Sequence, residues 1–225
     1  MKVEIEALRR IQRELSLKIV VQDVFKTSVT KISGIDLAFV KEKAIVACVT
    51  MSFPSLEDVK KKILETELDF PYIPTLLSFR EGPAIVKMIN SLRSETDIFL
   101  VNAQGIAHPL FCGCASHVGV LTQKPTIGVA SSNLCGIYDH EPIEVGEAVP
   151  MYYSGRAVGW ILKSKKGCRP IFISPGHLVS LESSLKIVKD CLKNHKLPEP
   201  LYNAHRLANE ERNKRLNQPI KARRI

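Results

Sequence analysis

The chain has 225 residues, of which 45% are hydrophobic and 24% are charged, which is ordinary for a soluble globular protein. This length supports one domain with a substantial core. The formal net charge of +9 favours an anionic partner, and nucleic acid is the commonest partner of that kind. A basic soluble enzyme without such a partner is the alternative that composition leaves open.

Membrane-spanning and disulfide-stabilised classes are not favoured. No run approaches the roughly 18 consecutive apolar residues of a membrane span. The first 13 residues lack the apolar centre of a signal peptide. The six cysteines form no CxxC pair, so we expect reduced and mostly buried thiols. These features predict an intracellular, cytoplasmic protein without a membrane segment.

The spacing of apolar residues predicts two helices and a strand meander in the first half of the chain. One helix is expected over residues 3–17. A second is expected over residues 76–93, where Gly82-Pro83 either kinks the helix or marks its start. Short polar breaks separate three strand-like runs between these helices, as in an antiparallel meander. The runs cover residues 28–40, 43–53 and 61–70.

Helices and strands alternate in the second half. Residues 97–105 begin with a continuously apolar run, as in a strand buried on both faces. The remaining expected elements are a helix over 112–123, a strand over 125–131, a hairpin around Ser154-Gly155 with one further strand over 148–174, a helix over 178–194, and a last helix after Pro200. This order predicts a mixed α/β sheet flanked by helices. We expect a single domain over residues 1–225 with a basic, frayed tail at 217–225.

Two carboxylates fall on otherwise apolar faces. Asp36 lies inside a strand-like run with the small residues Gly34 and Ala38 on its own face. The alternative is an edge-strand aspartate that faces solvent. Glu81 lies four residues from both Leu77 and Ile85, and therefore on the apolar stripe of its helix. A carboxylate facing a core needs a metal ion, an arginine, a proton or other hydrogen-bond partners.

Histidines occupy three different settings. His205 lies among Leu201, Ala204 and Ala208 on the last helix, either as a hydrogen-bonded core residue or as part of a site. His108 lies in a loop after a buried strand, where functional residues concentrate. His117 lies at helical spacing inside an apolar helix, and we expect it to serve packing.

Tyr72 lies in a loop stiffened by Pro71 and Pro74. A rigid, presented aromatic ring can stack on a base or insert into a duplex. A tyrosine that lies over the sheet edge is the alternative. Residues 174–177 (SPGH) are expected to form a structural turn at a strand end rather than a phosphate contact.

These segments together resemble the endonuclease V family, whose fold is a ribonuclease-H-like sheet. The resemblance runs through most of the chain, and FPYIPTLLSFREGP at 70–83 with QGIAHP at 104–109 carries it most specifically. The other matching stretches are SGIDLAF, ASHVGV, PTIGVA, PIFISPGHLVSLESS and LPEPLYNAHR.

The resemblance implies Mg²⁺-assisted hydrolysis, with Mn²⁺ able to substitute, of DNA or RNA that contains deaminated purines such as hypoxanthine. The implied cut lies one nucleotide beyond the lesion on its 3′ side. Asp36 and Glu81 would hold the metal and act in catalysis, with His205 as the polar catalytic residue near them. Tyr72 would fill the gap left by the displaced base. The residues implied to contact nucleic acid are Pro71, Tyr72, Ile73, Thr75, Ala103, Gly105, His108 and Ser131.

The sequence departs from the family pattern at four positions. Asn102-Ala103-Gln104-Gly105 stands where the family has Asp-Gly-Gln-Gly, so Asn102 takes the place of the second metal carboxylate. An amide oxygen can bind Mg²⁺ but brings no charge. Ala103 and Thr75 replace usual glycines, and an added Cβ narrows a base pocket. Ser131 replaces a usual lysine.

Two functions follow: a metal-dependent nuclease with altered activity, or a nucleic-acid-binding protein that keeps the fold and has lost cleavage. A repurposed interaction domain is a third. Residues 203–225 hold seven Lys or Arg against two Glu, which predicts salt-sensitive nucleic-acid binding.

Overall fold

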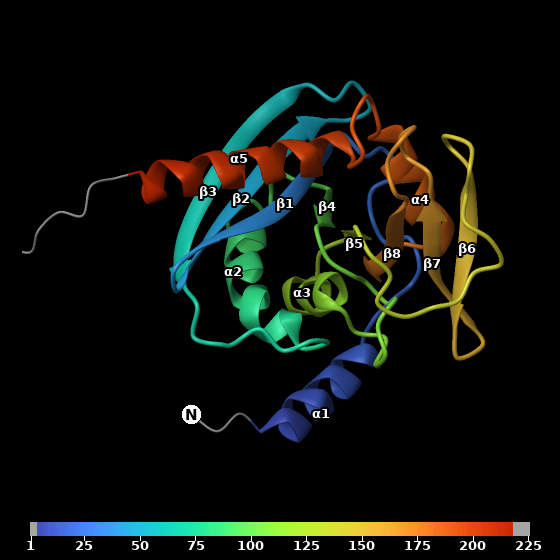
Figure 1. Ribbon diagram of the computed structural model, residues 1–225, viewed down its shortest axis with the longest axis horizontal. Helices are drawn as coiled ribbons and strands as arrows, with labels where there is room; N and C mark the ends of the chain where they lie inside the picture. The colour runs from blue at the N-terminus through green and yellow to red at the C-terminus, as the bar shows by residue number, and fades with distance from the viewer. Residues whose placement is uncertain (1–3, 218–225) are drawn as a thin grey trace, which may run out of the picture.

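The computed structural model describes residues 4–217, which form five helices and eight strands in one sheet (Figure 1). The helices are α1 (Ile5–Ser16), α2 (Leu77–Ser91), α3 (Cys114–Thr122), α4 (Leu181–Asp190) and α5 (Glu199–Leu216). The strands are β1 (Lys31–Val40), β2 (Lys43–Ser52), β3 (Asp58–Glu67), β4 (Ile98–Val101), β5 (Thr126–Ala130), β6 (Ala148–Tyr153), β7 (Arg156–Leu162) and β8 (Ile171–His177). Residues 218–225, which hold nearly all of the expected frayed tail, lie outside the described residues.

The sheet is mixed, with strand order β3-β2-β1-β4-β5-β8-β7-β6. The predicted mixed sheet flanked by helices is therefore confirmed. The first three strands form the expected antiparallel meander, and β1, β4 and β5 run parallel. All four residues of β4 are buried, as predicted for a strand covered on both faces. Both β1 and β4 are inner strands, which places the segment after β4 next to the middle of β1.

The second half of the sheet agrees with the predicted hairpin but not with the predicted turn. Ser154 and Gly155 join β6 to β7 and both have positive φ, as a tight hairpin turn requires. Residues 174–177 belong to β8 and pair with β5, so their assignment as a turn is wrong. A strand tolerates Pro175 here because β7 pairs with β8 only from Ile171 to Ile173. No local pattern shows that pairing.

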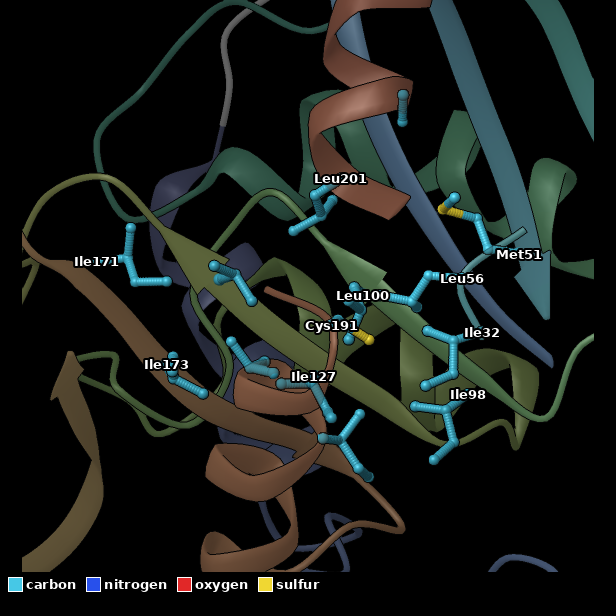
Figure 2. Packing of buried hydrophobic residues seen from close by; sticks show 14 of the residues in the cluster. Ile32, Met51, Leu56, Ile98, Leu100, Ile127, Ile171, Ile173, Cys191 and Leu201 are labelled. Atoms are coloured by element: carbon cyan, nitrogen blue, oxygen red, sulfur yellow. The ribbon is translucent and has the colours of Figure 1, made fainter. Parts of the chain in front are cut away.

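Helices α4 and α5 cover one face of the sheet. A continuous apolar cluster joins strand residues such as Ile32, Leu100 and Ile173 to Cys191 after α4 and to Leu201 of α5 (Figure 2). Gly34 allows α5 to approach β1 closely, because a Cβ at that position would lie 2.2 Å from the carbonyl carbon of Pro200. Small residues on β1 therefore let the backbone of α5 pass directly over the sheet.

Helices α2 and α3 cover the opposite face, and α1 packs outside α3 through Leu15 and Val120. Helix α2 begins at Leu77, so the alternative start near Gly82 is wrong and Pro83 lies inside the helix. All six cysteines are free thiols, and four of them are buried, as expected. None of the helices within residues 4–217 is long and apolar enough to cross a membrane.

Candidate active site

Asp36 of β1 is the centre of a hydrogen-bonded group. It is 6% exposed and lies on an inner strand, so the alternative of a solvent-facing edge aspartate is wrong. Its Oδ1 accepts a hydrogen bond from Nδ2 of Asn102 at 2.8 Å, and its Oδ2 lies 2.6 Å from Nδ1 of His205. The backbone N–H of Asn102 donates to the carbonyl of Ile35 just past the end of β4, which positions the amide. Both carboxylate oxygens therefore have a partner.

His205 reaches Asp36 from α5. Its helix neighbours are buried as predicted, namely Leu201, Ala204 and Ala208. The imidazole itself is 53% exposed, so the alternative of a core histidine is wrong. Because a carboxylate only accepts hydrogen bonds, Nδ1 of His205 carries a hydrogen. In the neutral ring Nε2 is then an acceptor, and Nδ2 of Asn209 lies 3.2 Å from it.

Glu81 is half-buried on α2. Burial raises the pKa of its carboxyl to about 7, the negative charge of Asp36 acts in the same direction, and Arg80 opposes both more weakly. Arg80 is engaged elsewhere: it donates to the carbonyl of Phe70, and its guanidinium lies 5.4 Å from the ring centroid of Phe39. The two carboxylates therefore repel one another, and Glu81 holds a proton in a substantial fraction of molecules near pH 7.

A cavity of about 260 Å³ adjoins this group and shares Asn102 with it. Five of the residues implied to contact nucleic acid line it, namely Tyr72, Thr75, Ala103, His108 and Ser131. Tyr72 is 68% exposed, so the alternative of a ring covered by the sheet edge is wrong. The cavity thus lies between the hydrogen-bonded group around Asp36 and the exposed side chain of Tyr72.

Thr75 has an unusual backbone conformation, with φ 69°, in the left-handed region that β-branched residues rarely adopt. Its carbonyl accepts hydrogen bonds from Nε2 of Gln12 and Nε2 of His108, both at 2.9 Å. The N–H of Leu110 donates to Nδ1 of His108, which leaves the hydrogen on Nε2. Burial lowers the pKa of His108, which favours this neutral form. Two side chains thus hold the strained residue in place.

Three of the implied contact residues do not line the cavity. Pro71 and Ile73 flank Tyr72 in the loop before α2. Gly105 serves packing instead, since a Cβ there would lie 2.0 Å from the carbonyl oxygen of Pro175. His117 packs as expected, with its ring edge-on to Phe79 at a centroid distance of 5.3 Å.

The sequence patterns missed three buried polar residues that line the cavity, Gln12, Ser78 and Gln104, and two exposed ones, Ser132 and Asn133. Gln12 is buried on α1, but its partners Thr75 and Cys112 are distant in the chain. Gln104 belongs to the QGIAHP stretch that carries the resemblance, and its presence there was the available indication of a role.

Comparison with known proteins identifies the family. The sequence profile of endonuclease V matches residues 13–206. The chain belongs to the endonuclease V family. It is 37% identical over 212 residues to endonuclease V of Archaeoglobus fulgidus, covering 93% of this chain and 94% of that protein. It is 39% identical to endonuclease V of Rippkaea orientalis over 211 residues, covering 93% and 92%.

Solved endonuclease V structures share the fold. The catalytic domain of human endonuclease V superposes with a TM-score of 0.87 at 27% identity, over 97% of this chain and 100% of that domain. Endonuclease V of Ciona intestinalis, in complex with a 24mer DNA containing an inosine followed by a ribo-adenosine, superposes with a TM-score of 0.82 at 27% identity, over 94% and 98%. The ribonuclease-H-like fold expected from the resemblance is confirmed.

Endonucleases V are metal-dependent nucleases, so the donor set must be tested against a cation. Among residues 4–217 no three His, Cys, Asp or Glu side chains are grouped to hold a metal ion. Asp36 and Glu81 offer two carboxylates whose mutual repulsion a cation would relieve. Asn102 presents Nδ2 to Asp36, but rotation of the amide exchanges nitrogen and oxygen. The residues therefore fit a divalent cation with two charged ligands and one neutral oxygen ligand.

Proposed function

We propose that this protein is an endonuclease that cleaves DNA or RNA beside a deaminated purine such as hypoxanthine. The observation that carries the proposal is the Asp36–Glu81 carboxylate pair, which Asn102 connects to a cavity that the exposed Tyr72 also lines. Flipped bases enter pockets of this kind and stack on aromatic side chains. The inosine-containing DNA bound by the Ciona enzyme supports the same substrate class.

Asp36, Glu81 and Asn102 would hold the cation, for which we propose Mg²⁺ with Mn²⁺ as a substitute. When bound, it supplies Lewis-acid charge at the phosphodiester. His205 fixes the orientation of the Asp36 carboxylate through the bond to Nδ1. Without metal the pKa of Glu81 is raised to about 7, so binding of the cation would release the proton that Glu81 holds in part of the molecules. Asp36, Glu81 and His205 lie on β1, α2 and α5, and Asn102 lies just past the end of β4, so the fold brings four segments together.

Tyr72 and the cavity would act on the base. The ring of Tyr72 is free to occupy the space left in the stack, and Thr75, Ala103, His108 and Ser131 would surround the displaced base. The proposed cut lies one nucleotide beyond that base on the 3′ side and leaves a 3′-hydroxyl and a 5′-phosphate. Pro71 and Ile73 would act by holding Tyr72 in its loop, and Gly105 by allowing the close approach of Pro175, since none of the three lines the cavity.

Binding without cleavage is the second candidate, and Asn102 favours it. Its Nδ2 donates a hydrogen bond to Oδ1 of Asp36, so the carboxylate already has a partner when no cation is bound. Loss of one charged ligand weakens Mg²⁺ binding while leaving the cavity and Tyr72 intact.

The deciding experiment is a cleavage assay on end-labelled DNA and RNA strands that contain one inosine, with Mg²⁺, with Mn²⁺ and with EDTA. We expect metal-dependent cleavage that Asp36→Ala abolishes. Asp139→Ala is the matched control, because Asp139 is exposed in the loop before β6. If the protein binds the inosine strand specifically but forms no metal-dependent product, binding without cleavage becomes the preferred function. Neither binding nor cleavage would refute both candidates.

A further inference from the structure

Two glutamine side chains in the cavity have amide oxygens without a donor. Gln12 is 1% exposed and Gln104 is 9% exposed, and both line the cavity. Among the described residues neither Oε1 atom receives a hydrogen bond. The hydroxyl of Ser78, 2% exposed in the same lining, also has no partner there. Buried polar atoms without partners are costly, so their gathering in one cavity points to a ligand that pairs them.

Backbone carbonyls fix the orientation of both amides. Nε2 of Gln12 donates to the carbonyls of Thr75 at 2.9 Å and Cys112 at 3.3 Å. Nε2 of Gln104 donates to the carbonyl of Ser132 at 2.8 Å. A carbonyl can only accept, so flipping either amide would set two oxygens against each other. Oε1 of each glutamine is therefore a fixed acceptor, which only a hydrogen donor such as a ring N–H can pair.

We propose that Gln12 and Gln104 determine base specificity by accepting hydrogen bonds from ring N–H groups of the displaced base. Deamination produces such donors: N1 of adenine is an acceptor, whereas N1 of hypoxanthine carries a hydrogen. Xanthine carries two ring N–H groups and can satisfy both oxygens. The hydroxyl of Ser78 can donate to the exocyclic oxygen that deamination creates. The inference rests on the proposed function, because it assigns the cavity to the base.

The test measures binding in EDTA, where cleavage does not interfere, by fluorescence anisotropy. The probes are one DNA strand with a single hypoxanthine and the same strand with unsubstituted purine, which has neither the ring N–H nor the oxygen. Hypoxanthine has one ring N–H and pairs one of the two oxygens, so its strand should bind about 5- to 150-fold more weakly in either Gln104→Leu or Gln12→Leu, whichever removes the partner of that N–H. Binding of the purine strand should change by less than about 2-fold, since no N–H is present to lose its partner.

Controls separate specificity from folding. Gln22→Leu makes the same chemical change at an exposed position outside the cavity and should alter neither affinity. Gln12 also donates to the carbonyls of Thr75 and Cys112, so Gln12→Leu could weaken the fold. Its binding result is interpreted only if its melting temperature is close to that of the parent. The parent protein with a 1-methylhypoxanthine strand removes the donor from the ligand side and should show a similar loss.

The outcomes distinguish the two levels of inference. Equal losses on the hypoxanthine and purine strands would show that the glutamines only support the fold. Unchanged selectivity in both variants, with the parent still preferring hypoxanthine, would overturn the glutamine assignment and leave the proposed function standing. A parent that binds all strands alike would overturn both.

Discussion

Asn102→Asp is the substitution that tests the site most directly. It replaces an amide by a carboxylate of nearly equal volume, so packing around the end of β4 should hardly change. The amide nitrogen now donates to Oδ1 of Asp36 at 2.8 Å. After the substitution an oxygen faces that carboxylate, in a place where Asp36 already raises the pKa of Glu81.

The loss of stability that Asn102→Asp causes without metal follows from the contact between residue 102 and Asp36. The lost hydrogen bond to a charged group is worth about 1.5–3 kcal/mol. Two unit charges at the 2.8 Å of the present contact would repel by about 6 kcal/mol at an effective dielectric constant near 20, an upper bound that protonation and small shifts reduce. We therefore expect about 3 kcal/mol of destabilisation at neutral pH in EDTA. For a chain of this size that lowers the melting temperature by about 6–12 °C.

Metal should reverse the effect. A third carboxylate strengthens the ligand set, and each tenfold gain in affinity adds about 1.4 kcal/mol of stability at saturating Mg²⁺ or Mn²⁺. A few kcal/mol of recovered transition-state stabilisation would raise the cleavage rate of inosine-containing strands about 10²-fold or more. The assay is a melting curve in EDTA and across a metal titration, together with single-turnover cleavage.

Asn90→Asp is the matched control, because Asn90 is exposed on α2 and undergoes the same chemical change. If Asn102→Asp melts within about 1 °C of the parent in EDTA, the bond between Asn102 and Asp36 is not part of the folded protein. If it is destabilised but gains neither metal affinity nor cleavage, the other departures, Ala103, Thr75 and Ser131, have removed catalysis, and the binding protein becomes the preferred function.

Four further outcomes are expected. Tyr72→Ala should leave the melting temperature nearly unchanged, because the ring is exposed, and should lower binding of inosine strands relative to normal strands about 5- to 150-fold; a large loss of stability would contradict the stacking role. Thr75→Gly should stabilise the fold by up to about 1 kcal/mol in denaturant titration, because glycine adopts φ 69° without strain; destabilisation would show that the threonine side chain matters more. Burial lowers the pKa of His117 to about 4, so stability should fall as pH drops from about 6.5 toward 4, by about 2 kcal/mol at pH 5, and His117→Leu should lose that component; a parallel pH profile would refute it. Nucleic-acid affinity should drop on the order of 10³-fold between 50 and 200 mM salt if about six phosphates are contacted. An affinity that does not change with salt would exclude binding through phosphate contacts.

Much of the fold follows from periodicity in the sequence. Three strand-like runs separated by short polar breaks predicted the meander, and the apolar run of β4 predicted a strand buried on both faces. Ser154-Gly155 predicted its hairpin because few residues tolerate the positive φ of that turn. Residues 174–177 were assigned wrongly, because their Pro and Gly favour turns locally and only pairing with β5 makes them a strand.

Periodicity also predicted part of the site. Asp36 and Glu81 stand out because a carboxylate on an apolar face is costly without a partner, and the sequence shows which face a residue takes. Their partners followed only from the family resemblance and not from any local pattern. Asn102 is 66 residues from Asp36 and His205 is 169, and no local pattern relates such positions.

The sequence by itself determined the family, the sheet with its helices, and the residue types that carry the chemistry. Only the tertiary structure decided that His205 is half exposed, that Asn102 bonds to Asp36, and that Gln12 joins the cavity from α1. Periodicity fixes the direction of each side chain relative to its own helix or strand. Which side chains meet depends on where whole elements cross, and Gly34, where the backbone of α5 passes over β1, sets that crossing through close packing of distant segments.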